Sequence, residues 1–414
     1  MLPGLTARIN GPRPFVAAVT YIGAGREKQC VEHVAVFLAD LSGGGAERAM
    51  LDLAIGFAKR GLRVDLLLAS ATGPYVVDIP PNVHLVDLDV GRVSRAIAPL
   101  ASYLRRVRPD VLFTTLPHSS LAASIARLLA RTRTTLFLRE ATTVSARPIP
   151  SRALRRRAQL LALRWAYGHA DGVVAVSEGV ANDLHVTFGV KRRKVWTLYS
   201  PVVTDEVVDL SMLDPEHPWF VDNAPPVVLG VGRLRDHKGF LTLMHAFAQV
   251  RATRSIRLVL LGEGEQRAVL ERRAHELGVA EDVALPGFVR NPFAFMARAG
   301  VYVLSSEFEG LPGTLIQAMA CGCPVVATDC RSGPREILQD GRFGALVRVG
   351  DVNAMAEAIA SVLSAPPPPD HARERALRFS SDRVVSAHIA AFEDTVRRKW
   401  SPTTDDAGHT SVGP

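Results

Sequence analysis

The feature that most constrains the fold is a repeated alternation of short apolar segments with longer amphipathic ones. The segment "HVAVFLA" is followed by "GAERAMLDLAIGFAKRG" and "RVDLLLA", and the alternation continues through "PDVLFTT", "TTLFLRE" and "DGVVAVS". A continuous apolar strand followed by a helix of about ten residues or more is typical of βαβ units with a buried parallel sheet. The sequence therefore predicts a doubly wound α/β domain from the first of these strands onward.

The alternation stops once and then resumes. The segment "YSPVVTDEVVDLSMLDPEHPWFVDNAPP" is rich in Pro and Asp and has no steady period, whereas "PVVLGVGRL", "IRLVLLGEG", "VYVLSS" and "CPVVATD" continue the pattern. At 414 residues the chain is also too long for one ordinary core. We therefore predict two Rossmann-like domains that face each other across a cleft lined by the carboxyl ends of their strands. The predicted divisions are an N-terminal extension (1–30), an N-terminal acceptor domain (31–200), a linker (201–225), a C-terminal donor domain (226–370), C-terminal helices that pack back on the N-terminal domain (371–400) and a disordered tail (401–414).

Charge and cysteine usage narrow the classes of partner. A net charge of +8 favours an anionic partner, which could be nucleotide phosphate, a membrane surface or nucleic acid. No nucleic-acid motif accompanies this charge, so nucleic acid is not expected. The four cysteines are too few for a disulfide framework and have no partner pair at zinc spacing, so we expect reduced thiols and no metal. Without a long apolar run or a signal-like start, a cytoplasmic protein is expected.

The densest basic region covers residues 151–165, where three consecutive arginines precede several leucines and a tryptophan. A basic amphipathic helix of this kind can lie on an anionic bilayer, which would make the protein peripheral at the inner face of the membrane. An ordinary surface helix with a solvated arginine face explains the same pattern, and both interpretations stay open.

In the second half, "VVLGVGRLRDHKGF" places Gly232, Arg233 and Lys238 between a strand and the next helix. Two cations five residues apart in such a loop can converge on one pyrophosphate beside the helix N-terminus, and two unrelated surface cations are the alternative. The stretch lacks both the Gly-x-Gly-x-x-Gly fingerprint and the Gly-Lys-Ser/Thr ending of a P-loop, which argues against a dehydrogenase or an NTPase.

The stretch "EFEGLPGTLIQAMACGCPVVATD" places Glu309 directly before a helix. Free N–H groups at the helix start favour an anion, and Glu309 could accept hydrogen bonds from ligand hydroxyls, so the pattern indicates a site for a polyol and a phosphate. The alternative is a glutamate that only complements the helix dipole. Two weaker signals, Gly264 in "LGEGEQRAVLE" and the pair Val289 and Arg290 in "GFVRNPF", could contact a nucleotide or form ordinary turns.

The first half offers less specific candidates. The loop "GGGAER", with Gly43, Gly44 and Gly45, could close over a ligand or be a plain flexible loop. His118 follows a strand at the carboxyl end, where it could bind hydroxyls or move protons, or be a structural histidine. Arg139 and Glu140 also end a strand and could face the acceptor or form an internal ion pair.

Together these motifs resemble the retaining family 4 glycosyltransferases of the GT-B fold, in the branch that reads EGLP where other members read EGFG. The likeness runs from about residue 33 to 395 and includes "ADGVVAVSEGVANDL" and "GPREIL". It implies transfer of a sugar from a nucleotide diphosphate sugar, with a UDP-sugar expected, to the hydroxyl of a glycan or lipid-linked acceptor in glycolipid, capsule or polysaccharide synthesis. No cofactor and no metal are implied.

The resemblance also implies roles for single residues. Arg233 and Lys238 would bind the donor diphosphate, Glu309 would hold donor-sugar hydroxyls, and His118 would contact the donor sugar or align the acceptor. The family has a second acid eight positions after the first, which holds the ribose, and that position is Gln317 here. The "GGGAER" loop, Arg139 and Glu140 would lie on the acceptor side. The implied donor-binding set is Gly232, Gly264, Val289, Arg290, Gly310, Leu311, Pro312, Gly313, Thr314, Leu315 and Gln317, with the amides of Gly313 to Leu315 capping the phosphate.

Gln317 leaves two rival functions open. Glutamine keeps a hydrogen-bond acceptor but loses the charge, at a cost of about 1–2 kcal/mol in ribose binding. The protein could therefore be a sugar-nucleotide-binding relative with weak catalysis. A sugar-nucleotide epimerase of the same fold is the other rival, although its acid and base residues are not identifiable.

Overall fold

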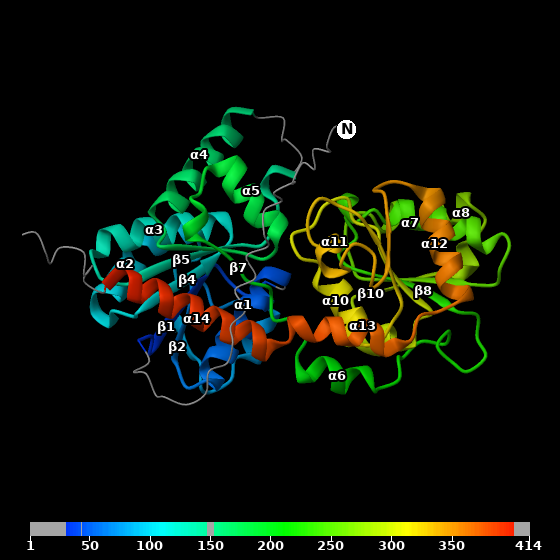
Figure 1. The fold of residues 1–414 in the computed structure, drawn as a ribbon, viewed down its shortest axis with the longest axis horizontal. Helices are drawn as coiled ribbons and strands as arrows, with labels where there is room; N and C mark the ends of the chain where they lie inside the picture. The colour runs from blue at the N-terminus through cyan, green and yellow to red at the C-terminus, as the bar shows by residue number, and fades with distance from the viewer. Residues whose placement is uncertain (1–29, 43, 147–152, 401–414) are drawn as a thin grey trace, which may run out of the picture.

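The structure is a computed structural model that describes residues 30–42, 44–146 and 153–400. It contains two separate parallel sheets, and Figure 1 shows the two lobes that they form side by side. The predicted pair of doubly wound α/β domains is confirmed. Gly43, the predicted tail and all but the last residue of the predicted N-terminal extension lie outside the described residues.

The N-terminal sheet has seven strands in the order β3-β2-β1-β4-β5-β6-β7. Its central strands are buried along almost their whole length, which is why they read as continuous apolar runs. Helices α2 to α5 cover one face of the sheet, and α1 and α14 cover the other. The strands are β1 (His33–Leu38), β2 (Arg63–Leu68), β3 (His84–Asp87), β4 (Val111–Thr115), β5 (Thr135–Glu140), β6 (Gly172–Ala175) and β7 (Val195–Thr197). The helices are α1 (Gly45–Lys59), α2 (Ile97–Val107), α3 (Pro117–Ala130), α4 (Ala153–His169) and α5 (Glu178–Phe188).

The C-terminal sheet has six strands in the order β10-β9-β8-β11-β12-β13. Helices α7, α8 and α12 cover one face, and α6, α9, α10, α11 and α13 cover the other. The strands are β8 (Val227–Val231), β9 (Arg257–Leu261), β10 (Val283–Gly287), β11 (Val301–Leu304), β12 (Val325–Thr328) and β13 (Ala345–Val347). The helices are α6 (Asp205–Ser211), α7 (Phe240–Arg251), α8 (Arg267–Glu276), α9 (Pro292–Arg298), α10 (Gly313–Ala320), α11 (Pro334–Ile337), α12 (Val352–Ser364), α13 (Pro369–Ala376) and α14 (Ser381–Trp400).

The chain crosses between the domains twice. The first crossing was predicted as an irregular linker, but it contains α6, which packs against α9 because Val207 is buried in the C-terminal core. The second crossing separates α13, which packs on α10, from α14, whose Phe392 lies in the N-terminal core (Figure 1). The two crossings touch each other, since Val203 forms a parallel bridge with Ser380. Two paired segments therefore form the hinge between the domains.

Candidate active site

Each sheet has one point at which the strand order reverses, and the motifs singled out in the sequence lie at these points. In the C-terminal sheet the reversal lies between β8 and β11, whose following loops carry Lys238 and Glu309. In the N-terminal sheet it lies between β1 and β4, which precede the "GGGAER" loop and His118. Ligands of open α/β sheets bind outside the carboxyl ends of the strands at such switch points. Both halves of the candidate site are thus placed by topology.

The charged centre of the C-terminal half is an ion pair. Lys238 ends a short 3₁₀ turn, and its Nζ lies 2.7 Å from Oε1 of Glu309. Ser306 donates its hydroxyl to the same oxygen at 2.8 Å. The side chains of Lys238 and Glu309 are 21% and 14% exposed, so both can reach a ligand without leaving a sealed interior. The phosphate-binding cation and the hydroxyl-binding carboxylate expected from the sequence are therefore neighbours.

A glycine fixes the loop that carries Lys238 against the loop that carries Glu309. Gly239 has a left-handed φ of 63°, and a Cβ at this position would lie 2.1 Å from the carbonyl oxygen of Ser305. Ser305 in turn donates its hydroxyl to the carbonyl of Lys238 at 2.7 Å. Only glycine permits this approach, so the separation of Lys238 and Glu309 is set by backbone contacts as well as by their own ion pair.

The other residues of the predicted donor set differ in how closely they are held. Arg233 is exposed, and its side chain has no ion-pair or hydrogen-bond partner among the described residues, which leaves its guanidinium free for an anion. Gly264 packs against the backbone of Leu234, where a Cβ would lie 2.3 Å from the carbonyl oxygen. Val289 is half-buried against the C-terminal core, and Arg290 is exposed.

Helix α10 begins without a side-chain cap, because its N-cap residue is Pro312. The amide of Leu315, expected to cap a phosphate, donates instead to the carbonyl of Pro312 at 3.2 Å. In the described part of the chain the amides of Gly313 and Thr314 have no acceptor. The predicted three-amide cap is therefore reduced to two amides in this conformation.

Gln317 points toward the hinge. Its Nε2 donates to the carbonyl of Val202 at 3.4 Å, and Val202 also lies against Gly313, where a Cβ would come within 3.2 Å of Cγ1. Val202 belongs to the first crossing between the domains, and nothing in the sequence pattern singled it out. The position expected to hold the ribose thus has a hydrogen bond to the connecting segment.

The loop that carries Glu309 and Gly310 also forms part of the contact between the two domains. Gly310 forms an antiparallel bridge with Thr142, and a Cβ on Gly310 would lie 2.0 Å from the carbonyl oxygen of Ala141. Thr143 donates its hydroxyl to the carbonyl of Glu309 at 3.2 Å. Leu311 packs against the apolar cores of both domains. The loop after β5 therefore holds the EGLP loop from the N-terminal side.

A second contact between the domains lies beside the first. The hydroxyls of Ser177 and Ser332 are 2.7 Å apart, and Glu336 accepts hydrogen bonds from the Tyr199 hydroxyl and the Glu178 amide, each at 2.9 Å. Burial raises the pKa of Glu336. Ser177 and Glu178 come from "ADGVVAVSEGVANDL" and Glu336 from "GPREIL", so the sequence marked these two segments but could not show that they pair.

The N-terminal half of the site is more open. His118 is exposed at the start of α3, directly after Leu116 and Pro117. Leu116 has a left-handed φ of 72°, an uncommon value for leucine, and this turn directs the chain out of β4 into the helix. Gly44 caps α1 without a side-chain hydrogen bond, and Gly45 is exposed.

Arg139 and Glu140 lie in the interior, with 2% and 4% of their surfaces exposed. Arg139 donates to the Ser200 hydroxyl at 2.7 Å, and burial lowers its pKa to about 10. Glu140 accepts from the hydroxyl of Tyr167 at 2.7 Å. Because both side chains are buried, we do not include them in the proposed acceptor site.

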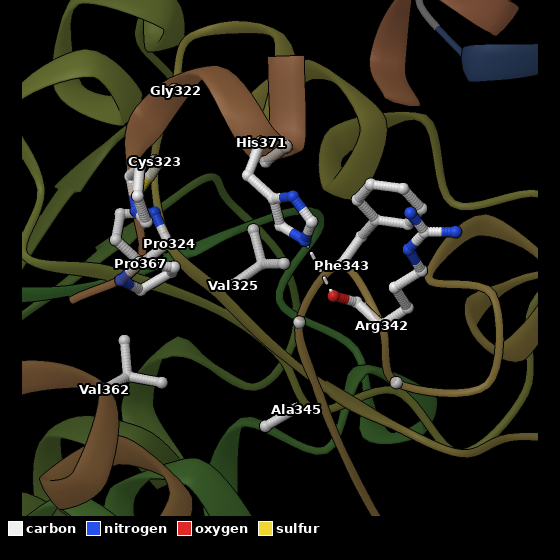
Figure 2. A pocket seen from close by; sticks show the side chains of 14 residues that line it. Gly322, Cys323, Pro324, Val325, Arg342, Phe343, Ala345, Val362, Pro367 and His371 are labelled. Atoms are coloured by element: carbon white, nitrogen blue, oxygen red, sulfur yellow. Dashed lines mark hydrogen bonds between the residues drawn. The ribbon is translucent and has the colours of Figure 1, made fainter. Parts of the chain in front are cut away.

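A cavity of the C-terminal domain lies away from these loops. It measures about 280 Å³ and lies at the amino ends of β12 and β13, the edge opposite the donor loops. Figure 2 shows His371 reaching across it, with its Nε2 hydrogen-bonded to the carbonyl of Arg342 at 3.0 Å. Its remaining walls are largely apolar, as Val325, Phe343 and Val362 illustrate. This cavity has none of the charged groups expected at a donor site.

Within residues 30–42, 44–146 and 153–400, no three His, Cys, Asp or Glu side chains form a group that could hold a metal ion. Among the helices described, none is both long enough and apolar enough to span a bilayer.

Comparison with known protein families matches both domains. The model of Glycosyltransferase Family 4 matches residues 43–206, and the model of Glycosyl transferases group 1 matches residues 217–379. The matches thus cover the two Rossmann-like domains in turn, and residues 207–216 of the first crossing lie between them.

Individual relatives cover nearly the whole chain. One is the Campylobacter jejuni N-acetylgalactosamine-N,N'-diacetylbacillosaminyl-diphospho-undecaprenol 4-alpha-N-acetylgalactosaminyltransferase, 28% identical over 80% of this chain and 90% of the relative. Another is the lipopolysaccharide core biosynthesis glycosyltransferase LpsE of Rhizobium meliloti, 28% identical over 78% and 86%. Among solved structures, Anabaena HepE in complex with UDP has a TM-score of 0.71 and 21% identity, covering 86% of this chain and 98% of that one. The chain belongs to the GT-B glycosyltransferases, with a family 4 domain at its N-terminus and a group 1 domain at its C-terminus.

Proposed function

We propose that this glycosyltransferase moves a sugar, with retention, from a nucleotide diphosphate sugar to a hydroxyl in glycolipid, capsule or cell-surface polysaccharide synthesis. The observation that carries the proposal is the pairing of Lys238 with Glu309 at the switch point of the C-terminal sheet. A diphosphate and a sugar are joined in the donor, and a cation beside a carboxylate can bind both parts at once. The relatives named above act in lipopolysaccharide synthesis or on a diphospho-undecaprenol acceptor, which supports this acceptor class.

On this proposal the chemistry rests on charge stabilisation of the leaving group. The bond between the anomeric carbon and the diphosphate oxygen breaks as the acceptor oxygen bonds to that carbon. Arg233 and Lys238 would stabilise the negative charge that develops on the diphosphate, together with the free amides of Gly313 and Thr314. The departing diphosphate can take the proton of the acceptor hydroxyl. Fixed cations supply the charge, so no metal is required.

Glu309 would change partner when the donor binds. Its Oε1 accepts from both Lys238 and Ser306. A carboxylate accepts at about four sites, two on each oxygen, so Lys238 and Ser306 together occupy Oε1. A diphosphate that draws Lys238 away would free one of these sites for a sugar hydroxyl. Binding of the diphosphate and of the sugar are therefore coupled through one ion pair.

His118 and the loop of Gly44 and Gly45 would contribute from the other domain. They lie at the switch point of the N-terminal sheet, and the bridge between Gly310 and Thr142 brings that sheet's neighbouring strand, β5, against the donor loop. Movement about the two crossing segments would open the site for the acceptor and close it against water.

The first experiment concerns the nucleotide. We would titrate the protein calorimetrically with UDP, GDP and ADP in EDTA and compare Gln317→Glu with the wild type. Metal-free binding of UDP at roughly micromolar affinity, about −8 kcal/mol, is expected. Gln317→Glu should bind up to about tenfold more tightly if residue 317 faces the ribose, since a charge-assisted bond replaces a neutral one. Gln249→Glu, an exposed change on α7, is the charge-matched control.

The outcomes separate the rival functions. Tight binding by the wild type without turnover of any donor and acceptor pair would favour the sugar-nucleotide-binding relative. Conversion of the donor sugar without an acceptor would favour the epimerase. Absence of binding by the wild type to all three nucleotides would remove the donor assignment of the cleft.

We also propose that α4 contacts an anionic membrane near the acceptor. Its described outer face combines Leu161, 59% exposed, and Trp165, 37% exposed, with the exposed arginines 157 and 164. An exposed leucine and tryptophan beside arginines suit the headgroup boundary of a bilayer. Leu161→Glu should reduce co-sedimentation with vesicles that contain anionic lipid, and unchanged co-sedimentation would leave α4 an ordinary surface helix. The first residues of the predicted segment lie outside the described residues.

A further inference from the structure

We propose a second anion site, for a diphosphate group, at the edge of the N-terminal sheet opposite the catalytic cleft. A cavity of about 660 Å³ lies there, between the ends of α2, α3 and α14. Asp110 and Thr134, which line it, directly precede β4 and β5, so the cavity faces the amino ends of the strands. Pockets of about 300–1,000 Å³ are the size at which proteins hold small ligands.

The cavity has an excess of positive charge, because four arginines and one carboxylate line it. Four exposed arginines line it, and in the described part of the chain none of them forms an ion pair with a carboxylate. The carboxylate in the lining, Asp110, already accepts hydrogen bonds from the amides of Glu32 and His33 at 2.8 and 2.9 Å. The four arginines are Arg105, Arg108, Arg131 and Arg133. Four like charges around one cavity repel one another unless an anion enters.

Two of these arginines have a backbone conformation that is uncommon for residues other than glycine and asparagine. Arg108 and Arg131 are the C-cap residues of α2 and α3, and both have a left-handed φ of 52°. Glycine or asparagine is usual there. A cation near a helix C-terminus complements the dipole, but an arginine one turn earlier, as Arg105 and Arg127 already provide, does so without the strained backbone. The recurrence of the same uncommon choice on two helices that face one cavity indicates a function for the two charges.

An aromatic side chain completes the cavity. Trp400, the last residue of α14, is 41% exposed, and the guanidinium of Arg133 lies 5.2 Å from its ring. The ring leaves part of its surface open to an apolar or planar group, while Arg133 is held over it. A ligand with a charged end and an apolar or planar end would therefore fit.

The number and spread of the arginines select the ligand class. A phosphate group carries a charge of about −1.5 to −2 near neutral pH, so about two guanidinium groups balance the charge of one phosphate. Four arginines from two helix ends and the following loop therefore suit a diphosphate better than a monophosphate. The diphosphate could be free in solution or carried on an apolar tail that lies against Trp400.

The test is calorimetric titration of the full chain with inorganic pyrophosphate and with geranyl diphosphate. The double variant Arg108→Gly/Arg131→Gly is expected to weaken both by at least about tenfold, one phosphate contact being worth that much. Because glycine is favoured at a left-handed C-cap, the variant should unfold at the same or a higher temperature, so lost binding cannot be attributed to misfolding.

Controls separate this cavity from the catalytic cleft. Lys238→Ala should lose any binding at the cleft and retain binding at the second site, and Arg106→Ala, an exposed arginine on α2 outside the cavity, should change nothing. Tighter binding of geranyl diphosphate that Trp400→Ala abolishes would identify a tail-bearing ligand, and equal affinities would identify a free one. Failure of both probes to bind, or equal binding by the double variant, would overturn the proposal.

Discussion

The two halves of the active site lie at equivalent places in their sheets, yet the chain holds them in different ways. On the donor side, an ion pair of 2.7 Å, the glycine approach at Gly239 and the bridge to Thr142 fix the loops after β8 and β11. On the side of the N-terminal sheet, which we propose binds the acceptor, Gly45 and His118 are exposed, and the side chain of His118 has no hydrogen-bond or ion-pair partner among the described residues. The loops of Lys238 and Glu309 are therefore fixed by contacts within the protein, whereas no such contact among the described residues fixes the side chain of His118.

The largest effect is expected from Lys238→Ala. Removal of one preorganised group that stabilises developing charge costs about 10²–10³ in rate, so transfer should fall by at least that much. The fold should persist, because Lys238 is partly exposed and Ser306 still satisfies Glu309. Transfer assays and thermal unfolding of the same preparation would check both statements.

Arg235→Ala is the matched control for this prediction. Arg235 lies in the same loop and pairs at 3.7 Å with the exposed Glu265, away from Glu309. If both variants lose activity equally, general loop disorder explains the loss and the diphosphate assignment of Lys238 fails.

The next largest effect is expected from Gly310→Ala, which tests whether the loop of Glu309 and Gly310 must be held by the N-terminal domain. A Cβ at Gly310 would lie 2.0 Å from the carbonyl oxygen of Ala141, so Gly310→Ala should separate the loops and lower kcat/KM by about 10²-fold, the cost of a misplacement of roughly 1 Å. Gly45→Ala, whose Cβ meets nothing within 4 Å, should leave nucleotide affinity unchanged. Similar losses of nucleotide affinity in both variants would contradict the contrast between the two sides.

The same contrast explains which parts of the molecule the sequence could predict. Strand periodicity gave both sheets, because fully buried parallel strands are apolar at nearly every position, and Lys238 and Glu309 were found because short local motifs position them. The hydrogen bond between Gln317 and Val202 and the contact between Ser177 and Ser332 join residues over 100 positions apart, which no local pattern encodes. The roles of Arg139 and Glu140 stayed open in the sequence, because a charged pair at a strand end looks the same whether it faces a ligand or the interior.

A smaller effect is expected from His118→Ala on the acceptor side. Loss of one hydrogen bond to a substrate hydroxyl should lower turnover by about tenfold. Because His118 lies outside the donor loops, the affinity for the nucleotide diphosphate should stay within about twofold. A weakened nucleotide affinity would mean that His118 contacts the donor, and the proposed difference between the two halves of the site would then be smaller.

The smallest effect on transfer is expected from Asp52→Asn, whose main effect should be on folding stability. Asp52 lies in α1, the helix that follows the loop of Gly44 and Gly45. Burial raises the pKa of Asp52 to about 6, against the opposing effect of Arg48, whose Nε lies 2.9 Å away. Arg48 also reaches Asp78 at 3.0 Å and Glu206 of α6 at 3.3 Å, so this arginine ties α1 to the hinge.

The sign of the pH dependence follows from the raised pKa. The folded protein holds the Asp52 proton up to about pH 6, whereas the unfolded chain releases it near pH 4, so this residue makes stability fall as pH rises between those values. The slope is at most about 1.4 kcal/mol per pH unit. Urea unfolding at several pH values should show Asp52→Asn removing this contribution, and Asp78→Asn, the exposed partner of the same arginine, leaving it in place. If Asp78→Asn removed it as well, the slope would belong to the whole ion cluster, and the acceptor helix would be fixed to the hinge by a network comparable to the one that fixes the donor loops.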